Sequence, residues 1–262
     1  MRVIKLTLQY EGTEYVGWQR QTQGASVQGL LEASLARIEG APVRVMGAGR
    51  TDAGVHALGQ VASARLRHAI ELPALVRALN AGLPRDIRVL DAEQMAFGFD
   101  ARTDARSKTY RYFLGTGTTV SPFDRRYVWY VSEPLDGARM AMAARLLEGR
   151  HDFAAFRASG SSALTTVRTV FEATVDEVPS GRLWRLTPEP CPPTTCGRLV
   201  VIEIRGDGFL RHMVRAIAGT LVEVGTGRRD VDSVTDLLAT GDRGRAGPTA
   251  PPHGLFLVGV DY

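Results

Sequence analysis

The chain has 262 residues, of which 44% are hydrophobic and 23% charged, which excludes a disordered or fibrous protein. The sequence lacks a run of about 18 apolar residues, and its alternating start MRVIKLTLQY lacks the apolar stretch of a secretion signal, so we expect a cytoplasmic protein. The net charge of +4 and pI of about 9.3 suit a polyanionic partner without requiring one.

The first hundred residues predict six elements. Apolar side chains alternate in residues 3–10 and recur at helical spacing from residue 27, with Ser26 available as an N-cap, and Pro73 opens the second helix. The expected elements are strand 3–10, helix 27–38, strand 43–46, strand 60–66, a helix from 73 and a strand from 87. This β-α-β-β-α-β order is that of the split βαβ, or ferredoxin-like, unit.

The second half repeats the pattern more loosely. The expected elements are strand 110–114, helix 136–147, strands 167–178, 183–187 and 199–205, helices 209–224 and 231–238, and strand 255–260. Residues 188–193 and 241–252 read as surface loops. We therefore predict an α+β protein of two ferredoxin-like lobes, residues 1–105 and 106–262, that form an extended antiparallel sheet flanked by helices.

Residues 47–56, GAGRTDAGVH, carry the densest chemical signal. The three glycines permit a tight backbone path that presents Arg50, Thr51 and Asp52 between two predicted strands. An aspartate beside an arginine can stay ionised, and a partly desolvated carboxylate can act as a nucleophile or a base. The pattern by itself also fits an ordinary turn, because Asp and Gly are common turn residues.

A dinucleotide-binding loop is a second alternative for this segment. Gly47-x-Gly49 begins such a fingerprint, but Asp52 stands where its third glycine belongs. A strand pattern follows in place of the long helix that the fingerprint opens. The sequence therefore argues against a nucleotide-dependent oxidoreductase.

Two further stretches combine cations with aromatic or apolar side chains. Residues 97–114, FGFDARTDARSKTYRYFL, fit an RNA surface, and equally a strand with one buried aromatic face. In residues 206–225 the spacing predicts that Arg211 and Arg215 share one face near a helix N-terminus, where they either bind phosphate or face water. Cys191 and Cys196 have neither the spacing nor the neighbouring His of a zinc site, so we expect no metal.

Taken together, the chain resembles the tRNA pseudouridine synthase A family. The resemblance runs nearly end to end through seven blocks in order and is far more specific than any one motif. The blocks are YEGTEYVGWQRQ, SVQGLLEASL, GAGRTDAGVHALGQVA, FDARTDARSKTYRY, HDFAAF, GFLRHMVRAIAGTLVEVG and AGPTAPPHGLFLVGVDY.

The resemblance implies a pseudouridine synthase fold and a cofactor-free isomerase of uridines 38, 39 and 40 in the tRNA anticodon stem-loop. It implies that Asp52 is the nucleophile, that Arg50 pairs with it and helps displace the base, and that Tyr110 stacks on the target uracil. It also implies a homodimer with each tRNA lying across both subunits. The chain departs from the family pattern at Glu11, Ala48 and Ala216, and the last puts a polar role at that helix position in doubt.

Overall fold

The computed structural model describes residues 1–117, 122–158, 160, 163–179 and 198–262, and these form an α+β protein. They divide into two compact units, Met1–Lys108 with Phe256–Tyr262, and Thr109–Leu255. The expected strand 183–187, the expected loop 188–193, Cys191 and Cys196 lie outside the described residues. No helix in the described ranges is long and apolar enough to cross a membrane.

The first unit contains the predicted β-α-β-β-α-β series and one later strand. Its elements are β1 (Arg2–Tyr10), α1 (Val27–Glu39), β2 (Val45–Gly47), β3 (His56–Leu66), α2 (Leu72–Gly82), β4 (Ile87–Met95) and β10 (Leu255–Asp261). The side chain of Ser26 accepts a hydrogen bond from the amide of Gly29 and so caps α1, and Pro73 lies in the first turn of α2, both as predicted. β3 begins at His56, earlier than the predicted residue 60, because it already pairs with β10 there.

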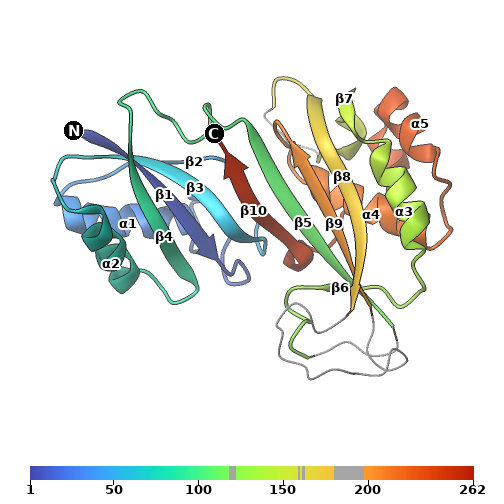
Figure 1. Ribbon diagram of the computed structural model, residues 1–262, viewed down its shortest axis with the longest axis horizontal. Coiled ribbons are helices and arrows are strands. Elements are labelled where there is room, and N and C mark those ends of the chain that lie inside the picture. The colour runs from blue at the N-terminus through green and yellow to red at the C-terminus, as the bar shows by residue number, and fades with distance from the viewer. Residues whose placement is uncertain (118–121, 159, 161–162, 180–197) are drawn as a thin grey trace. The chain divides into compact units, whose positions relative to one another are not determined.

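β1 is an interior strand of this unit. It pairs antiparallel with β3 on one side and with β4 on the other, and β2 pairs antiparallel with β3. Ile4, Leu6 and Leu8 alternate along β1 and are fully buried, because successive side chains of a strand point to opposite faces. Figure 1 shows α1 and α2 beside these strands. The end of β1 and the start of β3 therefore lie next to each other, and the loop before β3 carries Asp52.

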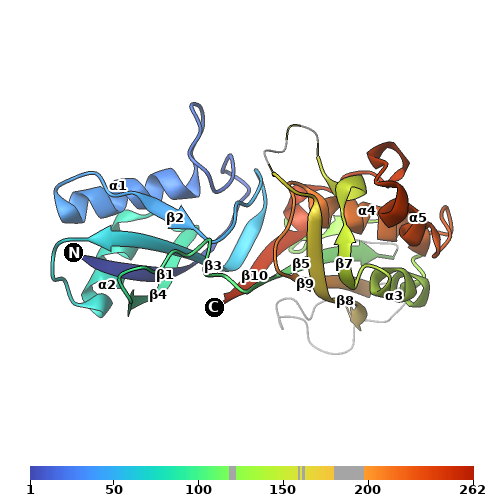
Figure 2. The ribbon, with the colours of Figure 1, turned by 90° about the horizontal axis from the view of Figure 1, so that it is seen from above.

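The second unit has strands in the order β5-β9-β8-β7, with β6 paired to β5. The elements are β5 (Ser107–Thr116, which starts at the end of the first unit), β6 (Trp129–Tyr130), α3 (Gly137–Arg145), β7 (Gly149–Asp152), β8 (Val167–Pro179), β9 (Arg198–Gly206), α4 (Met213–Gly225) and α5 (Ser233–Thr240). Figure 2 shows α3, α4 and α5 grouped beside these strands. Most of the predicted elements of this half exist, with ends that differ by a few residues.

One difference concerns candidate site residues. The helix predicted from residue 209 begins only at Met213, because His212 adopts a left-handed backbone with φ 61° and cannot continue a right-handed helix. Arg211 thus precedes α4, whereas Arg215 lies inside it. The prediction that Arg211 and Arg215 share a helical face through their four-residue spacing is wrong.

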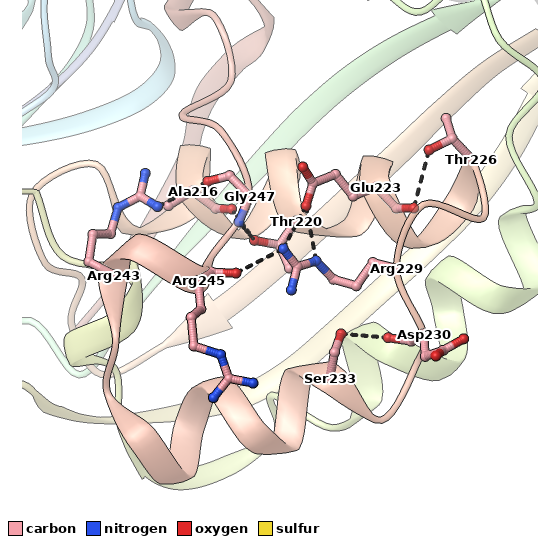
Figure 3. Close-up of polar contacts among 10 residues, drawn as sticks. All are labelled: Ala216, Thr220, Glu223, Thr226, Arg229, Asp230, Ser233, Arg243, Arg245 and Gly247. Atoms are coloured by element: carbon pink, nitrogen blue, oxygen red, sulfur yellow. Dashed lines mark hydrogen bonds and ion pairs between the residues drawn. The ribbon is translucent and has the colours of Figure 1, made fainter.

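The backbone of residues 247–248 lies directly against α4. Gly247 donates its amide hydrogen to Thr220 Oγ1 at 3.0 Å, and a Cβ on Gly219 would stand 1.8 Å from the carbonyl oxygen of Pro248. Beyond it, the Arg229 guanidinium donates from Nε and Nη2 to one oxygen of Glu223 at 2.9 and 2.8 Å (Figure 3). The segment after α5 is therefore locked to the helix that holds Arg215.

Candidate active site

Backbone hydrogen bonds hold the loop between β2 and β3 at several points. The amide of Ala48 donates to the carbonyl of Val61 at 2.8 Å, and the amide of Val55 donates to the carbonyl of Asp52 at 3.1 Å. The amide of Gly54, which has φ 75°, donates to the carbonyl of Tyr15. A loop with this many fixed points presents its side chains from a defined backbone.

A buried polar cluster lies beneath the loop. Tyr10 Oη and Thr51 Oγ1 are 2.7 Å apart, and the Gln60 amide nitrogen donates to Tyr10 Oη at 3.3 Å and to the Gly49 carbonyl at 2.9 Å. Burial raises the pKa of Tyr10 to about 12, which its hydrogen bonds with Thr51 and Gln60 partly oppose. The phenol therefore stays protonated at neutral pH and can donate a hydrogen bond.

The segment after β1 packs directly on the same loop. The amide of Trp18 donates to the carbonyl of Thr51 at 3.0 Å. A Cβ on Gly17 would stand 2.5 Å from that same oxygen, and one on Gly12 would stand 2.0 Å from the carbonyl oxygen of Val55. Both glycines are needed because a side chain at either position would collide with loop backbone.

His56, the first residue of β3, has a structural partner on each side. Its Nδ1 accepts a hydrogen bond from the amide of Gly12 at 2.9 Å, and its ring stacks on Phe256 at 4.6 Å between centroids. An Nδ1 atom that accepts a backbone hydrogen bond is unprotonated. His56 therefore joins the segment after β1 to β3 and β10 at the start of β3.

The two candidate residues of the loop are accessible. Arg50 is exposed and Asp52 is partly exposed, whereas Thr51 between them is buried. The alternation places two charged side chains toward solvent and one hydroxyl toward the core. A carboxylate presented in this way can reach a substrate, while hydrogen bonds to the buried Thr51 hold the adjacent backbone in place.

Tyr110 and Arg211 belong to the second unit. Tyr110 lies on β5, is 6% exposed and meets the ring of Phe209 edge to face, with centroids 5.0 Å apart. Arg211 is exposed, and its carbonyl accepts a hydrogen bond from the amide of Ala158 at 3.0 Å. Tyr110 thus has a packed ring, and Arg211 has a guanidinium on the surface.

Arg215 has a structural contact that its spacing did not predict. Its Nε donates to the carbonyl of Ala250 at 2.7 Å, and its own carbonyl accepts from the amide of Ala250 at 3.1 Å. The side chain is partly buried. Arg215 therefore also fastens the segment that precedes β10.

Sequence reasoning missed Tyr10, Gln60 and the packing glycines Gly12 and Gly17. Each lies outside the GRTDAG motif, and a single sequence does not show which distant residues meet a loop.

Within the described ranges, no group of three His, Cys, Asp or Glu side chains is placed to hold a metal ion.

Comparison with known proteins identifies the class. A family model described as tRNA pseudouridine synthase matches residues 7–104 and 143–262. Proteins named tRNA pseudouridine synthase A are similar over the full chain: one from Geotalea uraniireducens is 46% identical over 262 residues and 100% of both chains, and one from Myxococcus xanthus is 47% identical over 99% of this chain and 91% of its own. A solved Cbf5-Nop10-Gar1 complex has a chain that aligns at a TM-score of 0.29 and 12% identity, over 83% of this chain and 54% of that chain, which is too distant to add to the assignment.

The class is that of the isomerases that make pseudouridine. More narrowly, the chain belongs to the tRNA pseudouridine synthase family. The family that the seven sequence blocks predicted is thereby confirmed.

Proposed function

We propose that this protein converts uridines 38, 39 and 40 of the tRNA anticodon stem-loop to pseudouridine, with Asp52 as the catalytic carboxylate. The observation that carries the proposal is the loop at residues 48–55, whose backbone is fixed by hydrogen bonds while Asp52 stays accessible. Catalysis needs this combination, because a nucleophile must be held in place and yet reach the substrate.

The reaction exchanges one bond at the ribose for another. The N1–C1′ bond breaks, the uracil turns, C5 bonds to C1′, the proton on C5 is lost and N1 gains a proton. Asp52 acts as a nucleophile, at C1′ or at C6 of the base, or as a base that gives a glycal. Each of these routes starts from an ionised carboxylate at the uridine.

The target base must leave its stack to reach Asp52. Flipping a nucleotide out costs a few kcal/mol, and stacking on an aromatic ring returns about 1–3 kcal/mol per base. We assign the stacking to Tyr110 and the displacement of the base to Arg50, which is exposed two residues before Asp52. We assign phosphate contacts to Arg211 and Arg215.

The proposal includes the wider architecture. We infer two ferredoxin-like lobes, residues 1–105 and 106–262, and the antiparallel order β4-β1-β3-β2 supports the first of them. We also infer a cytoplasmic homodimer whose tRNA contacts both subunits. Sedimentation of the free protein and of its tRNA complex tests this part, and a monomer in both samples would contradict it.

Tritium release from 5-tritiated uridine in tRNA tests the role of Asp52, because the C5 hydrogen is lost in every turnover. Asp52→Ala and Asp52→Asn should release no tritium and should bind tRNA as the unaltered protein does. Asp176→Asn, at an exposed aspartate of β8, is the matched control and should keep full activity. Turnover by both Asp52 variants would refute the assignment.

A further inference from the structure

The buried polar cluster holds two residues of the loop near Asp52, namely Gly49 and Thr51. Tyr10, Thr51 and Gln60 are 4%, 6% and 0% exposed, so all three residues are buried. Buried polar groups are costly unless they find hydrogen-bond partners, and a satisfied network favours one arrangement. The cluster spans two rigid strands, because Tyr10 ends β1 and Gln60 lies in β3.

The chemistry of the partners fixes the direction of the hydrogen bonds made by Gln60. Gln60 Oε1 accepts from the amide of Val61 at 3.1 Å, so its NH₂ group is the one that faces the Gly49 carbonyl and Tyr10 Oη. Tyr10 Oη accepts from Gln60 and also shares a hydrogen bond with Thr51 Oγ1 at 2.7 Å, in which either hydroxyl can be the donor. The result is a connected path from Gly49, through Gln60 and Tyr10, to Thr51.

We propose that Tyr10 and Gln60 are positioning residues of the isomerisation, which hold Thr51 in place and thereby set the direction in which Asp52 points. The inference rests on the proposed function, since it takes Asp52 as the catalytic carboxylate. Thr51 is held at two atoms, because its hydroxyl bonds to Tyr10 and its carbonyl accepts from the amide of Trp18. Asp52 is the next residue, so the position of Thr51 sets where the backbone of Asp52 begins.

Packing alone does not require this arrangement. A phenylalanine at position 10 and a valine at position 51 would fill nearly the same space, and a pair of apolar groups needs no partners. A misplacement of a reacting group by about 1 Å costs roughly 100-fold in rate, whereas substrate affinity comes from many contacts elsewhere. Loss of the path should therefore lower the rate of the chemical step and leave the affinity for tRNA unchanged.

The test compares Tyr10→Phe, Thr51→Val, Thr51→Ser and the double variant Tyr10→Phe/Thr51→Val. Single-turnover tritium release at saturating enzyme gives the rate constant, and filter binding gives the Kd for tRNA. Tyr10→Phe and Thr51→Val should each slow the rate about tenfold or more, with Kd within about twofold. Thr51→Ser, which restores the hydroxyl, should react nearly as fast as the unaltered protein.

The double variant separates positioning from general weakening. Because both single changes remove the same hydrogen bond, the double variant should be no slower than the slower single variant. Multiplied losses in the double variant, unchanged rates in the single variants, a loss that appears only in Kd, or failure of Thr51→Ser to restore the rate would overturn the inference. Tyr262→Phe is the control, because it deletes a hydroxyl that bonds to the Ala101 carbonyl at 2.7 Å, and it should keep the full rate.

Urea unfolding of each variant, with the assay run well below the transition, shows that the measured protein is folded. If Tyr10→Phe does not fold, Thr51→Val and Thr51→Ser still decide the question. Turnover by Asp52→Asn would defeat the proposed function itself. An inactive Asp52→Asn beside fully active Tyr10→Phe and Thr51→Val would defeat only the positioning role.

Discussion

The backbone amide of Trp18 donates to the carbonyl oxygen of Thr51 at 3.0 Å, which joins the segment after β1 to the residue before Asp52. The indole of Trp18 is 2% exposed and fills the space at Gly47, where a Cβ would stand 2.4 Å from Nε1. The position of the candidate carboxylate thus depends on a segment some thirty residues earlier in the chain. Substitutions in that segment should affect catalysis without touching the substrate.

Gly17→Ala tests this dependence. Gly17 has φ 103°, and a Cβ there would stand 2.5 Å from the Thr51 carbonyl oxygen. A side chain at such a φ costs on the order of 1–3 kcal/mol, and the collision adds to that because the nearby atom is backbone. We expect a lower free energy of unfolding in urea and a rate of tritium release at least about tenfold lower.

Two other glycines separate the causes of that effect. Gly40 has φ 65° with nothing within 4 Å of its Cβ position, so Gly40→Ala reports the backbone cost alone, about 1 kcal/mol. Gly98 has neither a left-handed φ nor a neighbour, so Gly98→Ala should change stability by less than about 0.5 kcal/mol. If Gly17→Ala is no more harmful than Gly40→Ala, the contact with Thr51 is unimportant.

The buried phenol of Tyr10 should make stability depend on alkaline pH. Burial raises the pKa of Tyr10 from 10.0 to about 12, so between these values the unfolded chain has lost a proton that the folded protein keeps. The free energy of unfolding therefore falls as pH rises through this window, by up to about 1.4 kcal/mol per pH unit for this group. Below pH 10 both states hold the proton and the contribution is fully present.

Urea unfolding at a series of pH values from neutral to strongly alkaline checks this sign. Tyr10→Phe should be less stable than the unaltered protein at neutral pH, by about 1–3 kcal/mol, because Gln60 and Thr51 lose a partner. Its stability should then decline less steeply above pH 10. Other tyrosines such as the buried Tyr15 and the partly buried Tyr262 titrate in both proteins and cancel in the comparison. Equal slopes would therefore show that Tyr10 ionises normally.

Local pattern predicted the first unit well. Alternation identified β1, and the Ser26 cap and Pro73 placed the starts of α1 and α2, because these signals act within one turn or one strand. It did not predict that α4 starts at Met213, since nothing in the apolar spacing of residues 209–224 shows the left-handed backbone of His212. The same holds for the site. Asp52 lies in a motif that the sequence shows, whereas the pairing of β1 with β3 is what brings Tyr10 and Gln60 within hydrogen-bonding distance of that motif.

Gly219→Ala should reverse the usual effect of a helix glycine. Alanine is favoured over glycine inside a helix by about 1 kcal/mol, so propensity alone predicts a more stable α4. Here the added Cβ would stand 1.8 Å from the carbonyl oxygen of Pro248, which must move. We expect the collision to prevail and the free energy of unfolding to fall by about 1–3 kcal/mol or more. A rise in the thermal midpoint would mean that the segment after α5 yields easily.

Arg229 and Glu223 form a partly buried pair at the end of α4, with 20% and 24% of their side chains exposed. Arg229 Nη2 also donates to the carbonyl of Arg245 at 2.8 Å. We expect Arg229→Met and Glu223→Gln each to lower the free energy of unfolding by about 1–2 kcal/mol. Urea unfolding of the double variant should give a loss smaller than the sum of the two. The exposed pair of Arg198 and Glu177 is the control, and its disruption should cost less than about 1 kcal/mol.

Tyr110 allows stacking to be separated from its hydroxyl. Tyr110→Phe keeps the ring that meets Phe209 edge to face, so tritium release should continue at a rate close to that of the unaltered protein if stacking is the main contribution. Tyr110→Ala removes the ring and should slow release about tenfold to 100-fold, in line with about 1–3 kcal/mol per stacked base. Because Tyr110 is 6% exposed, the alanine variant also loses core packing, and Tyr110→Leu supplies a variant that fills more of the space. A folded Tyr110→Leu or Tyr110→Ala that reacts as fast as the unaltered protein would show that no uracil stacks there.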